Sequence, residues 1–389
     1  MGRSPEQVGS STGSTGPIAF AGGGTGGHVV PGLHVLERLI TRGSAPRALL
    51  WFGSGRAIED RVLRAAGSSL AHVPLARVSL ALEPPAGGAP TALRLALRTL
   101  PETIRARREL ERHGARVVLG LGGFTTLPVV LAARSLGLPV LLLEINAVPG
   151  RATRALARFA RRVHHAWPST LPAVPGERHV HSGPPLSAAF LAGAPSEEEA
   201  RRARSELGFE PERPLLLVLG GSQGAGSLNR LLADQARRAT SRGLQVLHQA
   251  GPGRLGEGAG QLAAYRCVEY LDDVPRALAA ATVVLCRGGA STLAEVTARA
   301  RPAVVVPYPH HADRHQERNA RLLGDGVRVV AEHELGPGLV DDLVRLAGEE
   351  GAGERARMAA VLAAAVPSQG SERIARELAE LASDRPRGA

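Results

Sequence analysis

The stretch GGGTGGHVVPG, from Gly22 to Gly32, decides how the first part of this chain folds. The apolar run PIAF before it indicates a short strand, and VVPGLHVLERLI after it repeats apolar residues at helical spacing. Pro31 suits a first helical turn, where an amide proton would have no partner. Glycines let the backbone bend and let a ligand come close, and the amides of a helix start attract anions. The stretch therefore predicts a strand, a tight turn and a helix, with an anion site at the turn.

The same glycines leave a second interpretation open. Gly22, Gly24 and Gly27 satisfy the dinucleotide pattern G-x-G-x-x-G, which is a weak signal when it stands alone. An NAD site needs an acidic residue at the end of the next strand, whereas the run ALLWFGSGR ends in Arg56. An arginine there suits the extra phosphate of NADP, so an NADP-dependent oxidoreductase stays open as an alternative.

Composition narrows the class of protein. The chain has 389 residues, of which 44% are hydrophobic, enough for two domains at about 150 residues per domain. All 47 basic residues are arginine, so a Walker lysine, a pyridoxal Schiff base and a lysine nucleophile are excluded. The net charge of +11 favours anionic partners, but only 3% of the residues are aromatic and no nucleic-acid motif occurs. We therefore expect phosphorylated substrates or an anionic membrane as partners, and no nucleic acid.

The N-terminal residues and the two cysteines predict a cytoplasmic protein. Residues 1–16 form a Gly/Ser/Thr-rich tail, expected to be disordered, that lacks the apolar segment of a signal peptide. Cys267 and Cys286 form neither a C-x-x-C motif nor a ligand cluster, so we expect no disulfide framework. The longest apolar region, residues 127–143, is interrupted by Arg134, two prolines and a glycine. It predicts a helix followed by a buried strand, and not a membrane span.

Strand-like apolar runs recur along the chain with helical segments between them. A first set follows the opening stretch, and a second set starts again at Pro214 with PLLLVLGGSQGAGSLNRLLADQ. Near-continuous apolar strands that alternate with helices indicate parallel sheets covered on both faces. We predict an α/β protein of two doubly wound, Rossmann-like domains, 17–185 and 186–389. They would face a cleft at the carboxyl ends of both sheets.

Two further glycine-rich turns follow strands in the second half. GGSQGAGS, residues 220–227, offers Ser222 and small residues, and CRGGAST, Cys286–Thr292, predicts an anion site at a helix start. Glu295 is expected within the first turn of that helix. Its carboxylate either bridges two ribose hydroxyls or favours the positive end of the helix dipole, and both interpretations stay open on the local sequence.

Seven ordered segments together resemble glycosyltransferase family 28, the MurG family. Its members add N-acetylglucosamine to the lipid-linked muramoyl-pentapeptide precursor of peptidoglycan. The resemblance runs from about Pro17 to the C-terminal helices. It rests on GGGTGGHVVPG, VLGLGGFTTLP, GLPVLLLEINAVPG, LGGSQGAGSLN, VEYLDDV, VVLCRGGASTLAE and PYPHHADRHQERNA.

The resemblance implies a GT-B fold and an inverting transferase that uses UDP-N-acetylglucosamine, with neither a metal nor another cofactor in the site. It implies that the first domain mainly holds the undecaprenyl-linked acceptor and the second mainly the donor. It also implies a peripheral protein at the cytoplasmic face of the cell membrane, bound to an anionic membrane surface.

The resemblance assigns residues to the site. His28 lies where the family has its proposed general base, and a neutral imidazole there can take the proton of an attacking hydroxyl. The alternative is a histidine that caps the helix or binds a phosphate. The positions that match the family's UDP-N-acetylglucosamine site are Thr25, Gly26, Gly27, Asn146, Ser222, Gln223, Tyr270, Leu271, Arg287, Ala290, Ser291, Thr292, Glu295, His315 and Gln316. Those expected on the acceptor side are Glu144, Phe124 and Thr125.

Two segments depart from the family pattern. The family's H-E-Q-N appears as LEIN, so Leu143 and Ile145 replace polar residues. The family's G-N-P-V-R appears as GPPLS, with Ser187 where an arginine is expected. An anion contact is therefore missing, and the acceptor contacts do not transfer completely.

Three further interpretations compete with the transferase. HHADRH sets His311, Asp313 and His315 at alternate positions, which on a strand would place metal ligands on one face. A substrate loop is favoured there, because no D-x-D motif accompanies it. A UDP-N-acetylglucosamine epimerase of the same fold would need no lipid acceptor, and a non-catalytic nucleotide-binding protein would leave His28 unexplained.

A basic helix is predicted from PETIRARRELERHG, with Pro101 at its start. At 100° per residue, Arg105, Arg108 and Arg112 lie within about 60° of one another. This arginine stripe is either an ordinary solvated face or a contact with an anionic membrane surface.

Overall fold

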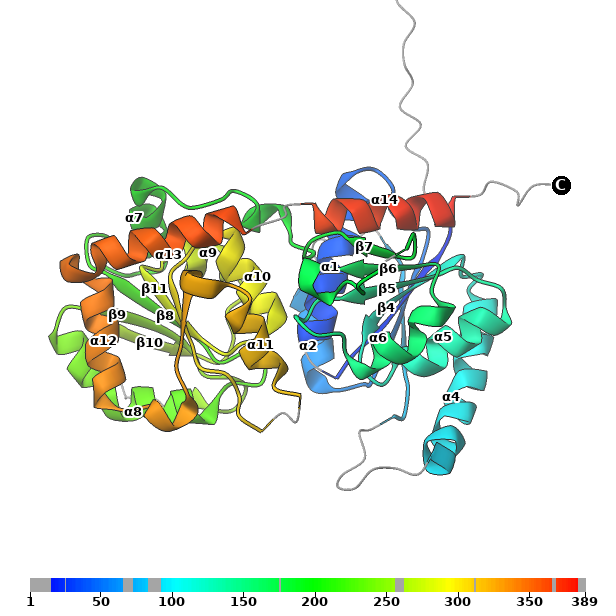
Figure 1. Ribbon diagram of the computed structural model, residues 1–389, viewed down its shortest axis with the longest axis horizontal. Coiled ribbons are helices and arrows are strands. Elements are labelled where there is room, and N and C mark those ends of the chain that lie inside the picture. Colours follow the sequence, from blue (N-terminus) through cyan, green and yellow to red (C-terminus); the bar gives the residue numbers. More distant parts are fainter. Residues whose placement is uncertain are drawn as a thin grey trace, which may run out of the picture.

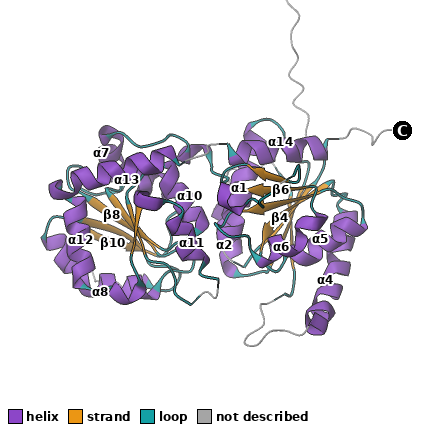
Figure 2. Ribbon diagram, in the orientation of Figure 1, coloured by secondary structure: helices purple, strands orange, loops and turns teal. Residues whose placement is uncertain are grey.

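The computed structural model describes residues 15–24, 26–65, 73–82, 92–174, 176–255, 262–310, 313–365 and 369–383. These residues form two parallel β-sheets, and helices cover both faces of each sheet (Figures 1 and 2). The prediction of an α/β protein with two doubly wound sheets is therefore confirmed. Residues 1–14 of the expected tail lie outside the described residues.

The first sheet has the strand order β3-β2-β1-β4-β5-β6-β7. Its strands are β1 (Ile18–Gly22), β2 (Leu49–Gly53), β3 (Leu75–Ser79), β4 (Val117–Gly122), β5 (Val140–Glu144), β6 (Arg162–His165) and β7 (His179–His181). Ile18 and Phe20 of the central strand pack into the core on one face, and Ala19 and Ala21 into the core on the other. A strand buried on both faces needs such a continuous apolar run, which is why PIAF was recognisable in the sequence.

Helices cover the two faces of the first sheet separately. On one face lie α1 (Gly26–Thr41) and α2 (Ala57–Ala65), and on the other lie α4 (Ala92–Arg112), α5 (Thr126–Ser135) and α6 (Arg151–Leu156). The predicted helix and buried strand of the longest apolar region are confirmed as α5 and β5. No helix of the described residues has the length and apolar character needed to cross a bilayer.

The second sheet has the order β10-β9-β8-β11-β12-β13. Its strands are β8 (Leu215–Leu219), β9 (Gln245–Gln249), β10 (Tyr265–Val268), β11 (Val283–Cys286), β12 (Ala303–Val305) and β13 (Val327–Val329). Its helices are α7 (Glu197–Glu206), α8 (Gly226–Ser241), α9 (Val274–Ala280), α10 (Ala290–Ala298), α11 (His315–Arg321), α12 (Pro337–Ala347) and α13 (Ala352–Ala364). Helices α8 and α12 pack together on one face, while α7, α9, α10 and α13 lie on the other (Figure 1).

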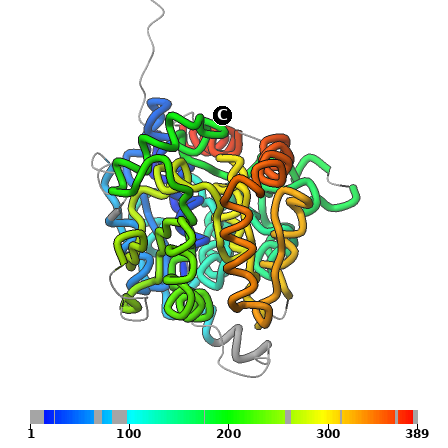
Figure 3. The backbone as a smooth tube through the Cα atoms, turned by 90° about the vertical axis from the view of Figure 1, so that its left-hand side faces the viewer, coloured from blue at the N-terminus to red at the C-terminus, as the bar shows by residue number. Residues whose placement is uncertain are grey.

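The last helix, α14 (Gly370–Ala382), returns to the first domain and packs against α1. The Ser371 hydroxyl donates to the Leu186 carbonyl at 2.7 Å, and the Gly16 amide donates to the Ala382 carbonyl at 2.8 Å. Figures 1 and 3 both place α13 and α14 along the top of the molecule. The domain limits 17–185 and 186–389 remain a prediction, to which the structure adds that α14 lies on the first sheet's side.

The two prolines predicted at helix starts lie inside their helices. Helix α1 begins at Gly26, which puts Pro31 in the second turn, and α4 begins at Ala92, which puts Pro101 well inside it. Both predictions of position were wrong, because the preceding residues continue each helix toward its N-terminus. Each proline removes one helical hydrogen bond.

Replacement of Gly370 by alanine should destabilise the fold. A Cβ at Gly370 would lie 2.4 Å from the carbonyl oxygens of Gly183 and Pro184, so α14 could not keep its place on the first domain. We expect Gly370→Ala to lower the free energy of unfolding by about 1–3 kcal/mol, measured by urea denaturation. Gly338→Ala in α12 is the matched control, because nothing lies within 4 Å of its added Cβ. Equal stability of the two variants would contradict the packing of α14.

Candidate active site

The carboxyl ends of both sheets face one cleft of about 1830 Å³. A site for one small ligand usually occupies about 300–1,000 Å³, so the cleft has room for parts of two substrates. The residues predicted from the sequence that line it are Gly26, Gly27, His28, Phe124, Glu144, Asn146, Ser222, Gln223, Tyr270, Leu271, Arg287, Ala290, Ser291, Thr292, Glu295, His315 and Gln316. Thr25 lies outside the described residues, and Thr125 is buried just before α5 and is not part of the lining.

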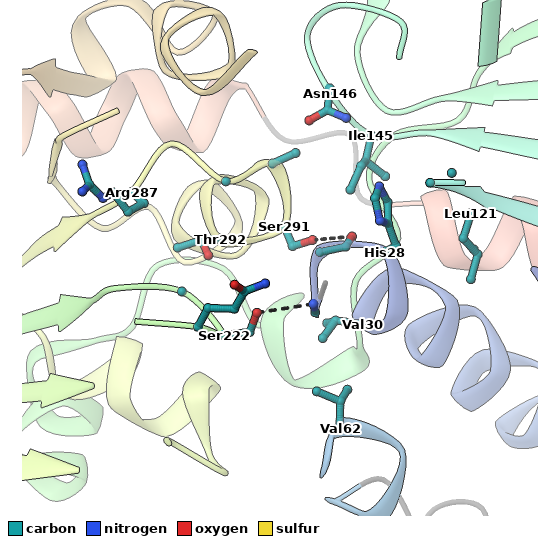
Figure 4. A pocket seen from close by; sticks show the side chains of 18 of the residues that line it. His28, Val30, Val62, Leu121, Ile145, Asn146, Ser222, Arg287, Ser291 and Thr292 are labelled. Atoms are coloured by element: carbon teal, nitrogen blue, oxygen red, sulfur yellow. Dashed lines mark hydrogen bonds between the residues drawn. The ribbon is translucent and has the colours of Figure 1, made fainter. Parts of the chain in front are cut away.

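The first glycine-rich turn joins β1 to α1. A Cβ at Gly22 would lie 2.5 Å from the Cβ of Leu121, so the end of the strand has no space for a side chain. Gly24 has a φ of 87°, in the left-handed region that favours glycine. The turn can therefore be short, and helix α1 begins at Gly26, a few residues after the strand ends. Its first turn brings His28 to the cleft (Figure 4).

His28 is held as a neutral imidazole of one tautomer. Its Nδ1 lies 3.1 Å from the carbonyl oxygen of Gly23, and because a carbonyl only accepts, Nδ1 carries the proton. Burial lowers the pKa of His28 and outweighs the Gly23 carbonyl and the Glu144 carboxylate, which raise that pKa. Burial is therefore the main reason that the ring is neutral. Nε2 then carries the basic lone pair.

Two hydrogen bonds join the start of α1 to the second domain (Figure 4). The Gly26 amide donates to Ser222 Oγ at 3.3 Å, and Ser291 Oγ donates to the Gly27 carbonyl at 3.4 Å. Pro31 explains the second bond, because it lacks the amide that would bond to the carbonyl four residues earlier. Pro31 in the second turn thus leaves the Gly27 carbonyl free to accept a hydrogen bond from the other domain.

The second glycine-rich turn joins β8 to α8. Gly221 and Gly224 have φ values of 81° and 72°, and a Cβ at Gly224 would lie 2.0 Å from the Ala250 carbonyl oxygen. The Gln249 side chain donates to the Gly221 carbonyl at 3.0 Å. The turn is therefore pressed against the segment after β9, and the residues that begin α8 line the cleft.

The third turn, between β11 and α10, is fixed by Arg287. Its guanidinium donates to the Val306 carbonyl at 3.0 Å and to Ser227 Oγ at 2.8 Å, and it forms an ion pair with Glu332. These contacts join three loops of the second domain. The placement of Arg287 in the UDP-N-acetylglucosamine site therefore stays a prediction, and its observed contacts hold the turn in shape.

Glu295 is a buried carboxyl group in the cleft wall. Helix α10 begins at Ala290, so Glu295 lies in the second turn and not in the first, as the sequence had suggested. The interaction of an acid with the helix dipole falls off after the first turn, which weakens the dipole interpretation. Burial raises the pKa of Glu295 to about 8. Its part in holding a ribose stays a prediction.

Glu144 organises the loop that follows β5. Its carboxylate accepts from the Asn146 amide at 3.0 Å, from the Gly150 amide at 2.7 Å and from Thr153 Oγ1 at 2.6 Å. These bonds satisfy a side chain that is only 3% exposed. They place Asn146 at the cleft.

Asn319 was missed in the sequence, although it joins the two domains. Its Oδ1 accepts from the Ala147 amide at 2.7 Å, and its Nδ2 donates to Asn146 Oδ1 at 3.3 Å and to the Gly288 carbonyl at 3.0 Å. The side chain is buried on α11. The only sequence signal was its place at the end of PYPHHADRHQERNA, because an asparagine among charged residues indicates a solvated helix face.

The segment that suggested metal ligands is not a strand where it is described. His315 begins α11, with its Nδ1 2.7 Å from Asp313 Oδ1, while His311 lies outside the described residues. Gln316 Oε1 accepts from the Tyr308 amide at 2.9 Å. Within the described ranges, no group of three or more His, Cys, Asp and Glu side chains is arranged to hold a metal ion.

The residues that depart from the family pattern lie at the same cleft. Leu143 and Ile145 pack into the core that extends from α1 into the second domain, which accounts for apolar side chains there. Ser187 lines the cleft. Its hydroxyl cannot supply the positive charge of an arginine.

Comparisons with known proteins agree with this geometry. Residues 18–165 match the N-terminal domain of glycosyltransferase family 28, and residues 215–369 match the C-terminal domain of the same family. The chain belongs to glycosyltransferase family 28. It has the GT-B arrangement of that family, with one glycine-rich turn of the first domain facing two of the second.

Curated relatives in family 28 are similar over most of their length. A Sorangium cellulosum protein is 40% identical over 384 residues, covering 94% of this chain and 88% of that protein. A Frankia casuarinae protein is 40% identical over 308 residues, covering 78% of this chain and 79% of that protein. Both are named UDP-N-acetylglucosamine–N-acetylmuramyl-(pentapeptide) pyrophosphoryl-undecaprenol N-acetylglucosamine transferase.

Solved structures show the same fold. The crystal structure of Acinetobacter baumannii MurG is 25% identical, with a TM-score of 0.66, and the match covers 95% of this chain and 100% of that one. CalG4, the calicheamicin glycosyltransferase, is 18% identical, with a TM-score of 0.60, and the match covers 95% of this chain and 98% of that one. At this identity the similarity supports the fold alone.

The raised pKa of Glu295 predicts how stability depends on pH. Between about pH 4.5 and 8 the unfolded chain has lost the proton of this carboxyl group, while the folded chain keeps it. Stability should therefore fall as pH rises through this window, by up to about 1.4 kcal/mol per pH unit from this group, and level off above it. Glu295→Gln removes the group, so the variant should gain stability relative to the parent from pH 5 to pH 8. Parallel unfolding free energies across this range would contradict the burial of Glu295.

Proposed function

We propose that this family 28 enzyme transfers N-acetylglucosamine from UDP-N-acetylglucosamine to the C4 hydroxyl of an undecaprenyl-linked muramoyl-pentapeptide, with inversion at the anomeric carbon. The reaction belongs to peptidoglycan synthesis. The observation that carries the proposal is the position of His28, a neutral imidazole at the point where the helix starts of both domains meet. The family and the names of its relatives do not favour an oxidoreductase or an epimerase.

The second domain supplies the donor half of the site. The starts of α8 and α10 would bind the diphosphate, because their amides and dipoles favour negative charge. Glu295 would accept hydrogen bonds from the ribose hydroxyls, and Tyr270 and Leu271 would lie beside the uracil. His315 and Gln316 would contact the sugar. These residues share one cavity wall, which supports the assignment.

The chemistry follows from the tautomer of His28. Nε2 takes the proton of the C4 hydroxyl as its oxygen forms a bond to the anomeric carbon. The bond from that carbon to the diphosphate oxygen breaks, and UDP leaves with the electron pair. The helix starts that bind the diphosphate also stabilise the charge that develops on it.

We also propose that the enzyme binds the cytoplasmic face of the membrane through α4. The arginine stripe of Arg105, Arg108 and Arg112 is exposed, and Leu100 and Ile104 on the same helix are 61% and 45% exposed. Exposed apolar side chains beside arginines suit the headgroup region of an anionic bilayer. The lipid-linked acceptor requires the enzyme to reach that surface.

Replacement of His28 should separate catalysis from donor binding. His28→Ala removes the base, so we expect kcat to fall roughly 100- to 10,000-fold with nearly unchanged UDP affinity. Ribose hydroxyls that donate to Glu295 would favour its ionised carboxylate, which an amide cannot replace. Glu295→Gln should therefore show the opposite pattern, with UDP affinity lower by about tenfold. Transfer of labelled N-acetylglucosamine to the lipid-linked acceptor measures the first effect, and calorimetry with UDP the second. Near-normal turnover of His28→Ala would remove the proposed base.

Membrane binding should depend on the arginine stripe. Replacing Arg105, Arg108 and Arg112 by glutamine should weaken binding to vesicles that contain anionic lipid, and added salt should weaken binding of the parent enzyme. Co-sedimentation with anionic and neutral vesicles measures both effects. Equal binding to the two kinds of vesicle, or full binding by the variant, would contradict the proposal.

A further inference from the structure

A single peptide group connects His28 to a buried carboxylate. The carbonyl of the Gly23–Gly24 peptide accepts the hydrogen bond from His28 Nδ1 at 3.1 Å. The amide of the same peptide, which belongs to Gly24, donates to the Glu59 carboxylate. The two ends of one peptide dipole are therefore occupied, one by the imidazole and the other by a negative charge.

The chain provides a fitted space for this carboxylate. Glu59 lies on α2 and is 3% exposed. It also accepts from the backbone amides of Ser54 at 2.9 Å and Gly55 at 3.1 Å. A Cβ at Gly23 would lie 2.4 Å from its Oε1, and a Cβ at Gly53 would lie 2.3 Å from its Oε2. Glycine at both positions is what allows the carboxylate to reach the peptide.

We infer that Glu59 is a positioning residue for the general base, acting through the Gly23–Gly24 peptide to fix the Nδ1-protonated tautomer and the orientation of His28. The inference rests on the proposed role of His28. The arrangement resembles a carboxylate bonded directly to a catalytic imidazole, with one peptide group inserted between them.

The physical effect is polarisation. The Glu59 charge draws the amide proton of the peptide, which makes the carbonyl oxygen more negative and a stronger acceptor for Nδ1–H. As Nε2 takes the proton of the attacking hydroxyl, the ring becomes positive and this bond strengthens. No proton moves to Glu59, because the Gly24 amide nitrogen and His28 Nδ1 keep their hydrogens throughout.

Other charged groups also act on His28. Burial lowers its pKa most, Glu144 and Glu59 raise it, and His315 lowers it. Arg56 donates to the Gly24 carbonyl at 3.3 Å and so contacts the same loop without touching the peptide between Gly23 and Gly24. Loss of the Glu59 charge should therefore lower the pKa of His28, whereas a loosened loop would expose the ring and raise it.

The first test reads the tautomer without any need for activity. In ¹⁵N NMR spectra the parent should show His28 protonated on Nδ1, with the signal assigned by its loss in His28→Ala. Glu59→Gln removes the charge that holds the Gly23–Gly24 peptide in place, so the carbonyl can turn away from Nδ1 and the ring should give a mixture of both tautomers. An unchanged Nδ1-protonated ring in Glu59→Gln would overturn the inference, whether or not the proposed transferase reaction is correct.

The second test uses the pH profile. Glu59→Gln should lower kcat about 10- to 100-fold at constant KM for UDP-N-acetylglucosamine, and should move the acidic limb of kcat/KM to lower pH. Glu59→Asp keeps the charge and should recover part of the loss. A shift of the limb to higher pH, or equal losses in Glu59→Asp and Glu59→Gln, would assign Glu59 a merely structural role.

The matched control lies one residue further along α2. Asp60 is an exposed acid that pairs with Arg77 at 2.8 Å, so Asp60→Asn removes the same charge from the same helix without touching the peptide. It should leave the tautomer, kcat and the pH profile unchanged. A loss in Asp60→Asn equal to that in Glu59→Gln would show a general charge effect and overturn the inference.

Discussion

All strand pairings in both described sheets are parallel, and this direction determines where every helix that follows a strand begins. The starts of α1, α8 and α10 consequently point into one cleft from two domains. Three positive helix ends directed at one volume favour negative charge there, such as the diphosphate of the proposed donor, although the chain contains no lysine. An arginine near the cleft can then have a structural role, and Arg287 joins loops of its own domain.

Close backbone approach is the second constraint, and it explains several of the glycines at the cleft. A Cβ at Gly26 would lie 2.9 Å from the Cβ of Ser222, and one at Gly288 would lie 2.2 Å from the Gln316 carbonyl oxygen. The turns therefore touch one another with little side chain between them. Backbone amides in such turns lie within reach of a ligand, and their positions depend on packing more than on side-chain identity. That helps explain how Leu143, Ile145 and Ser187 can depart from the family pattern without disturbing the turns.

The sequence predicted the two sheets and the three glycine-rich turns because both depend on local patterns, apolar runs followed by glycine. The other predicted residues of the cleft came from the family resemblance. It could not predict Glu59 or Asn319. Their partners lie on other elements, and an isolated acid or asparagine on a helix has no local signature. The predicted position of Pro31 was wrong by one turn. A proline inside a helix leaves the carbonyl four residues earlier without its helical donor, so prolines are expected in the first turn unless another residue bonds that carbonyl. Ser291, far away in the sequence, supplies that donor.

The position of α14 has a consequence for biosynthesis. Ile374 and Leu378 of this helix are completely buried in the core that also contains Ile18 and Phe20. The core of the first sheet is thus assembled from residues that come before and after the second sheet in the sequence. During translation the second sheet can be completed while the apolar face of α1 still lacks its cover. The first domain reaches its final packing only after α14 has left the ribosome. Its apolar surface is therefore exposed to chaperones and proteases for longer than that of the second sheet.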